Sequence, residues 1–160
     1  MKIISVEDGR YAVVKGAVLM GQKPRDIIER RARFTYGFGF NDDFIEGRYP
    51  EKFKTNWEGE ALCEGVFTKL IKAGQILHYN QQFSRDSHHT QRLQENKHVA
   101  LDTCLWRSPL PDSTYCYDEA DQCEKVSTIT AQAPPEGWPD VMNSVNILVV
   151  GETELTVKID

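Results

Sequence analysis

The chain has 160 residues, of which 40% are apolar and 27% charged. This is an ordinary globular composition, which argues against a fibrous repeat or long disorder, and the length predicts a single domain over residues 1–160. The net charge of −5 is uneven, because residues 1–80 carry 13 basic and 11 acidic side chains while residues 81–160 carry 6 and 13. The acidic second half repels polyanions, which disfavours nucleic acid as a partner.

The chain shows no sign of membrane insertion or secretion. No apolar run approaches the roughly 18–20 residues that cross a bilayer, and the first eight residues turn acidic before a signal-peptide core forms. We therefore expect a cytoplasmic protein, or one in the host cytoplasm or virion if it is virus-encoded. Without a secretion signal, the four cysteines are expected to be reduced thiols: Cys63, Cys104, Cys116 and Cys123.

The first 32 residues predict a hairpin followed by a short helix. An Asp-Gly pair at 8–9 lies between two β-prone runs, which predicts strands at 2–7 and 10–19. Pro24 is followed by acidic residues and then by arginines, an order that suits a helix dipole and predicts a short helix near 24–32.

The next segment combines a predicted strand with the main predicted helix. Residues 32–40 alternate strictly, with aromatic side chains on one face, which predicts a strand. Thr55 and Glu58 have capping-box spacing, and apolar residues then recur at helical intervals up to Gly74. The pattern predicts one main helix near 56–73.

The second half of the chain predicts further strands. Alternation predicts strands at 76–83 and 98–106, with a polar loop or short helix between them. A turn at 118–121 predicts a hairpin that places Cys116 opposite Cys123. Two strands close the chain, at 145–150 and 153–159 around Gly151 and Glu152. The fold class predicted is α+β, with a largely antiparallel sheet of about seven to nine short strands.

One aromatic string suggests RNA binding. Residues 36–40 read Tyr-Gly-Phe-Gly-Phe, which partly resembles the first ribonucleoprotein motif of RNA-recognition domains. The resemblance implies that Tyr36, Phe38 and Phe40 stack on bases, with Arg33 contributing positive charge. The alternative is that these aromatic side chains form the core face of a strand.

A second group of residues has the chemistry of a zinc site. Cys104, Cys116, Cys123 and His98 supply the soft and borderline ligands that zinc accepts. The spacing lacks the close C-x-x-C pairs of zinc fingers, so free thiols or a cross-strand disulfide are the alternatives. No cofactor is predicted, and zinc is the metal that this set would suit.

A third group is a histidine-rich stretch. His88 and His89, with His98 ten residues further along, offer a general base and metal ligands for a hydrolase or nuclease. A solvent-exposed polar loop explains the same residues.

The leading functional hypothesis is a non-enzymatic protein that binds or assembles with other proteins or with itself. Compact accessory proteins of this kind are common among virus- and mobile-element-encoded proteins, so an accessory or structural role there belongs to the same hypothesis. Aromatic side chains dominate interface energetics. The predicted contact residues are Trp57, Trp106, Tyr115, Tyr117 and Trp138.

Overall fold

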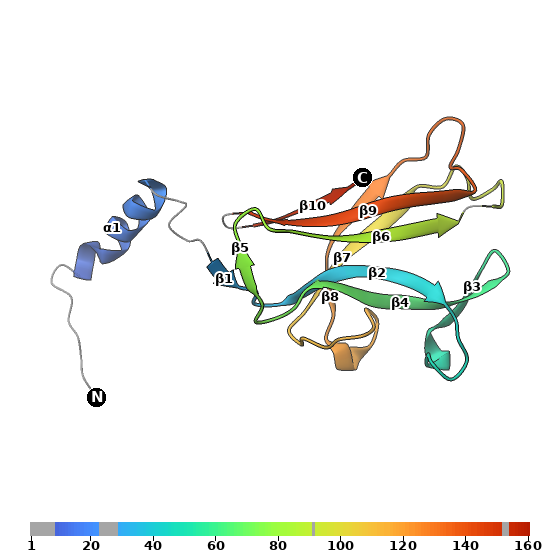
Figure 1. Ribbon diagram of the computed structural model, residues 1–160, viewed down its shortest axis with the longest axis horizontal. Coiled ribbons are helices and arrows are strands. Elements are labelled where there is room, and N and C mark those ends of the chain that lie inside the picture. The colour runs from blue at the N-terminus through green and yellow to red at the C-terminus, as the bar shows by residue number, and fades with distance from the viewer. Residues whose placement is uncertain (1–8, 23–28, 91, 152–153) are drawn as a thin grey trace.

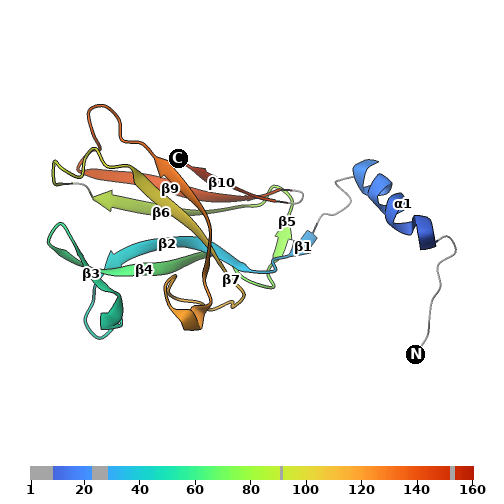
Figure 2. The same cartoon turned by 180° about the vertical axis from the view of Figure 1, so that it is seen from behind.

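The computed structural model describes residues 9–22, 29–90, 92–151 and 154–160, and within them the chain is mostly antiparallel sheet. A five-stranded sheet, in the order β3-β4-β2-β7-β8, faces a three-stranded sheet, β10-β9-β6, and a small β1-β5 ladder lies at one end (Figures 1 and 2). The strands are β1 (Glu29–Arg31), β2 (Thr35–Asp43), β3 (Lys54–Trp57), β4 (Glu60–Ile71), β5 (Ile76–His78), β6 (Gln82–Thr90), β7 (Leu101–Ser108), β8 (Glu124–Ala131), β9 (Val141–Val150) and β10 (Leu155–Ile159). The helical elements are α1 (Gly9–Gln22) and two 3-10 turns, η2 (Glu51–Phe53) and η3 (Glu119–Asp121).

The main core lies between the two large sheets. Phe38 on β2, Ile71 on β4 and Leu148 on β9 are 0% exposed and pack in the same cluster. Tyr36 and Phe40 are partly buried against this cluster. The strand predicted at 32–40 is therefore confirmed in part, because β2 begins at Thr35 and continues to Asp43. Its aromatic face is a core face because it meets the second sheet.

A second, smaller core covers the outer face of the five-stranded sheet. Phe67, Trp106 and Cys116 are buried there, under the segment 109–123, which includes η3. The glycines of β2 make room for this layer: a Cβ on Gly39 would lie 2.9 Å from the Cys116 sulfur. The sheet is thus covered on both faces, which explains why so many of its positions are apolar.

The main helix predicted near 56–73 is wrong, because this segment forms the end of β3 and the whole of β4. Glu58 and Gly59 have positive φ angles of 51° and 86°, the geometry of a tight hairpin turn. Cys63, Phe67 and Ile71 are the buried positions that suggested a helix. A spacing of four residues fits a helix and also a strand, so periodicity did not separate the two. In the structure Phe67 packs in the second core and Ile71 in the main core, with a register irregularity of β4 between them.

The N-terminal predictions also differ from the structure. The predicted strand at 10–19 is wrong, because residues 9–22 form α1, a segment in which alanine, leucine and methionine favour a helix. The predicted strand at 2–7 lies outside the described residues. Of the short helix predicted near 24–32, residues 23–28 are also outside them, while residues 29–31 form β1 paired with β5. Pairing with another strand overrides the local helical signal there.

The later strands are confirmed in part. The predicted strand at 76–83 is divided by a turn at Asn80, where φ is 61°, into β5 and β6. The polar loop predicted after it begins later, because β6 continues to Thr90. The final hairpin is confirmed as β9 and β10, with Val150 opposite Leu155. No helix in the described part of the chain is both long and apolar enough to span a membrane.

Candidate functional sites at the two ends of the sandwich

One end of the sandwich is closed by a hydrogen-bonded latch. We call it the loop end, and it carries the β3–β4 turn with residues 92–100 and 132–140. The Glu58 carboxylate accepts hydrogen bonds from the backbone amides of Arg92, at 2.8 Å, and Leu93, at 3.1 Å, and from Asn96 Nδ2 at 2.9 Å. Glu58 lies in the turn between β3 and β4 of the five-stranded sheet, and residues 92–96 lie in the connection that leaves β6 of the other sheet, so the latch fastens this connection to the β3–β4 turn.

The latch depends on the charge of Glu58. The hydrogen bond from Asn96 is the largest influence on this carboxyl group, and together with the two backbone amides it lowers the pKa of Glu58 below its ordinary value. Hydrogen bonds to the charged form favour that form. Near neutral pH the carboxylate is therefore ionised and makes all three contacts.

The loop end exposes apolar side chains beside this latch. The Trp57 indole N–H donates to the Thr90 carbonyl, and Thr90 pairs with Val141 across β6 and β9. Leu93 donates its backbone amide to Glu58. The loop-end patch consists of Trp57, Leu93, Val99 and Val141, whose exposed fractions are 43%, 47%, 52% and 57%.

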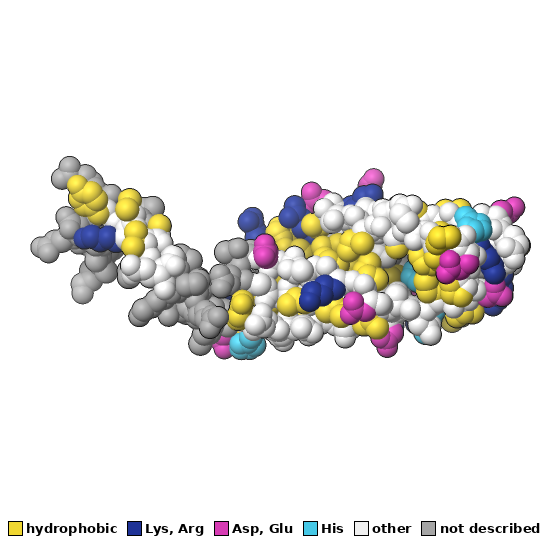
Figure 3. All heavy atoms as spheres, turned by 90° about the horizontal axis from the view of Figure 1, so that it is seen from above, with side chains coloured by type: hydrophobic (Ala, Val, Ile, Leu, Met, Phe, Trp, Pro, Cys, Tyr) yellow, Lys and Arg dark blue, Asp and Glu magenta, His cyan; other side chains and the backbone are white. Residues whose placement is uncertain are grey.

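Charged side chains around the loop-end patch are paired with one another. Arg92 forms an ion pair with Glu60 at 2.8 Å, and Lys97 pairs with Asp140. In Figure 3, apolar side chains reach the surface at the end of the sandwich away from α1, among charged and histidine side chains. An apolar centre with a charged rim is the usual arrangement of a protein interface.

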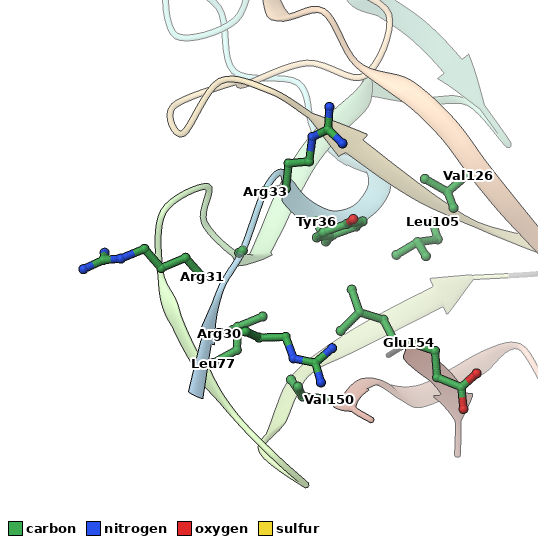
Figure 4. A pocket seen from close by; sticks show the side chains of 11 residues that line it. Arg30, Arg31, Arg33, Tyr36, Leu77, Leu105, Val126, Val150 and Glu154 are labelled. Carbon is green, nitrogen blue, oxygen red and sulfur yellow. The ribbon is translucent and has the colours of Figure 1, made fainter. Parts of the chain in front are cut away.

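The opposite end, which we call the arginine end, contains a pocket of about 400 Å³ between the two sheets. This volume falls in the range of small-molecule sites. Figure 4 shows the side chains that line it, drawn from both sheets and from the β1-β5 ladder. The apolar lining consists of Ala32, Tyr36, Leu77, Leu105, Val126, Val150 and Leu155.

Three arginines lie at the mouth of this pocket. Arg30, Arg31 and Arg33 line it, and within the described residues none of them forms an ion pair. Arg31 donates to the Gly74 carbonyl at 3.0 Å, and the Arg33 guanidinium lies 5.3 Å from the centre of the Phe34 ring. The mouth therefore carries positive charge that no carboxylate of the described chain neutralises.

The predicted contact residues occupy different environments. Trp57 is exposed at the loop end, and Trp138, half-buried nearby, donates its indole N–H to the Val99 carbonyl at 2.8 Å. Trp106 is 8% exposed and belongs to the second core. Tyr115 stacks on a phenylalanine ring at 4.4 Å, while Tyr117 is 57% exposed and meets Trp106 edge-on. Only Trp57 and Tyr117 of the five offer large exposed surfaces.

The three histidines do not converge on one point. His88 and His89 are neighbours on β6, so their side chains point to opposite faces of the sheet. The imidazole of His88 lies 2.5 Å from the Asn143 amide oxygen, while burial lowers the pKa of His89. His98 lies in the connection after β6, close to Gly137.

Three of the predicted zinc ligands lie in the same cluster, and the fourth does not. Cys104 and Cys123 pack against the second core around Cys116, whereas His98 is at the loop end. The predicted hairpin that sets Cys116 opposite Cys123 is wrong, because η3 and a left-handed Gln122 occupy the segment between them. Burial raises the pKa of the Cys116 thiol well above its usual range, and that of Cys123 also rises.

All four cysteines are free in the structure. No cluster of three or more histidine, cysteine, aspartate or glutamate side chains arranged for a metal ion is found among the described residues.

The residues of the RNA hypothesis face the core. Phe38 is fully buried, and Tyr36 and Phe40 are partly buried beside it between the sheets, so none of the three rings stands on an open sheet face. Arg33 and Tyr36 do come together, at the pocket of the arginine end.

Sequence reasoning missed the latch and the pocket. The spacing of Thr55 and Glu58 predicts a helix cap, although the adjoining Gly59 is equally typical of a two-residue hairpin turn, which the structure shows. The pocket has no local signal, since its lining comes from seven separate strands.

Comparison with known proteins shows that about half of this sequence is similar to a part of longer heat shock proteins. Human heat shock 70 kDa protein 12A is 38% identical over 74 residues, 46% of this chain and 11% of that protein, and the mouse protein matches to the same extent. Human heat shock 70 kDa protein 12B is 31% identical over 85 residues, 53% of this chain and 12% of that protein. The similarity thus spans about a tenth of these relatives. No family model and no solved structure matches the chain.

Proposed function

We propose that this chain is a non-enzymatic protein-binding module that holds an apolar segment of a partner polypeptide on the loop-end patch. The observation that carries the proposal is the group of four apolar side chains, each 43–57% exposed, on a surface whose charged rim is already paired. Contiguous exposed apolar surface with a polar rim is typical of interaction sites.

The partial similarity to two heat shock proteins supports this choice of partner. Heat shifts marginally stable proteins toward states that expose apolar segments. A patch that covers such segments would suit a protein of the heat shock response. Self-association through the same patch is the second form of the proposal, and a cytoplasmic location belongs to it.

The test measures binding of a permanently unfolded, reduced and carboxymethylated polypeptide by fluorescence anisotropy. Trp57→Ala is expected to weaken binding about tenfold or more, because a tryptophan at the centre of an interface commonly contributes 2 kcal/mol or more. Leu93→Ser is expected to act in the same direction, since it removes apolar surface while keeping the backbone bond to Glu58.

The matched control is Tyr79→Ala. Tyr79 is also 43% exposed, but it lies in the β5–β6 turn, away from the loop end. Its replacement should leave binding unchanged. Equal losses in Tyr79→Ala and Trp57→Ala, or unchanged binding in both loop-end variants, would contradict the proposal. Native mass spectrometry of the same samples reports whether a second copy occupies the patch.

The virus- or mobile-element origin, the histidine-centred hydrolase and the RNA-binding sheet stay predictions. Nothing in the fold favours them over protein binding, since the three histidines lie apart and the aromatic side chains of β2 face the core.

A further inference from the structure

We infer that the pocket at the arginine end binds a small anionic amphiphile, a free aliphatic chain that ends in a carboxylate. The chain would occupy the apolar interior between the sheets, and the carboxylate would meet the arginines at the mouth. This site is separate from the loop-end patch and does not depend on the proposed function.

The interior of the pocket has the chemistry of an aliphatic site. Leu77, Leu105 and Val150 are 4%, 5% and 1% exposed, so the floor of the pocket belongs to the main core and is preformed. Val126 on β8 and Leu155 on β10 form its sides. Both strands are the outermost members of their sheets, so no strand pairing among the described residues joins the two sheets along this side. Figure 2 shows these two edge strands from behind. A flexible chain can enter there without separating paired strands.

The positive charge at the mouth of the pocket favours a negatively charged head group. Arg30, Arg31 and Arg33 line the pocket, and no ion pair with a described carboxylate neutralises them. The Arg31 guanidinium points away from the pocket in Figure 4 and donates to the Gly74 carbonyl, so Arg30 and Arg33 are the arginines left for a head group. The acidic residue that lines the pocket, Glu154, is exposed, and its carboxylate points away from Tyr36 and Arg33 in Figure 4. The described lining therefore has an excess of two positive charges.

Arg30 is the arginine best placed to meet a carboxylate. It is half-buried, and its guanidinium extends across the pocket beside Val150 in Figure 4. Among the residues that the structure describes, no hydrogen bond or ring contact of this group is found. A partly desolvated cation without a partner is costly, and a carboxylate supplies the bidentate partner that a guanidinium fits.

The experiment is isothermal titration calorimetry of the full chain with decanoate below its aggregation concentration. We expect one site per chain. Each buried methylene should tighten binding roughly fourfold, so octanoate should bind about fifteenfold more weakly than decanoate. Decanol has the same chain without the charge and should bind at least about tenfold more weakly.

Two pairs of variants locate the site. The double variant Arg30→Gln/Arg33→Gln should lower decanoate affinity about tenfold or more, whereas Arg85→Gln, an exposed arginine on β6, should leave it unchanged. Val126→Trp should obstruct the pocket, whereas Val141→Trp at the opposite end should not. These positions are at the surface, and thermal unfolding confirms that each variant is folded.

Several results would overturn the inference. Equal affinity for decanol and decanoate would remove the role of the arginines, as would unchanged binding in the double variant. Binding to vesicles of anionic lipid without binding of free decanoate would assign the arginines to a membrane surface. Loss of decanoate binding in Trp57→Ala would place the ligand at the loop end, whereas failure of polypeptide binding alone leaves this site intact.

Discussion

At the scale of single residues, two glycines on the five-stranded sheet allow close contacts, one with the neighbouring strand and one with the segment that covers the sheet. A Cβ on Gly37 would lie 2.1 Å from the Thr68 carbonyl oxygen on the neighbouring strand. Gly65 has a φ of 68°, and the Tyr117 ring packs over it, with a Cβ there 2.5 Å from the ring. Any larger residue at either position must displace backbone or a packed ring.

Gly37→Ala is therefore expected to lower the free energy of unfolding by about 3 kcal/mol or more, because the added methyl group overlaps backbone that is held in the sheet. Urea unfolding followed by circular dichroism measures the change. Gly16→Ala is the control, since a Cβ at Gly16 has nothing within 4 Å and alanine favours the helix α1. A loss in Gly16→Ala equal to that in Gly37→Ala would show that packing is not the cause.

At the scale of elements, the segment 109–123 covers the outer face of the five-stranded sheet with almost no regular structure of its own. The Asp121 carboxylate accepts hydrogen bonds from the backbone amides of Thr114, at 2.9 Å, and Tyr115, at 2.6 Å. Ser113 donates to Ser108 at 2.6 Å, and Lys69 donates to the Ser113 carbonyl at 2.6 Å. These side-chain hydrogen bonds hold the segment in place, as backbone pairing with a neighbour would hold a strand.

Asp121→Asn should lower the free energy of unfolding by about 1–2 kcal/mol, because a neutral amide accepts weaker hydrogen bonds from the two backbone amides. The fluorescence of the nearby Trp106 should report the looser packing. The control is Asp112→Asn, at a carboxylate whose side chain is 85% exposed and whose only ion pair within the described residues is 3.8 Å long. Indistinguishable unfolding of the two variants would exclude Asp121 as the anchor of this segment.

At the scale of the whole molecule, the two ends of the sandwich are held differently. The latch at Glu58 fastens the connection after β6 to the β3–β4 turn at the loop end, whereas the arginine end stays open around its pocket. This difference assigns the two ends different partners in our proposals: an apolar polypeptide at the closed end and an aliphatic carboxylate at the open one.

The latch predicts acid sensitivity at the loop end. The pKa of Glu58 is lowered in the folded chain, so its contribution to stability is complete above the ordinary glutamate pKa of about 4.3 and is lost as the pH falls through the lowered value. Hydrogen exchange of the Arg92 and Leu93 amides should therefore accelerate relative to the core over that acidic range. Glu58→Gln should remove this pH dependence, and a variant that retains it would show that another group controls the latch.

The sequence by itself determined the antiparallel character, the core-facing alternation of residues 36–40 and the closing hairpin, because these depend on local patterns of period two and on turn residues. Only the tertiary structure decided that residues 60–71 form a strand. Their large buried side chains, Cys63, Phe67 and Ile71, are spaced by four residues, a spacing that also suits a helix, and pairing with the neighbouring strands resolves that ambiguity. The loop-end patch and the arginine pocket likewise exist only in the folded chain, since each gathers residues from strands far apart in the sequence.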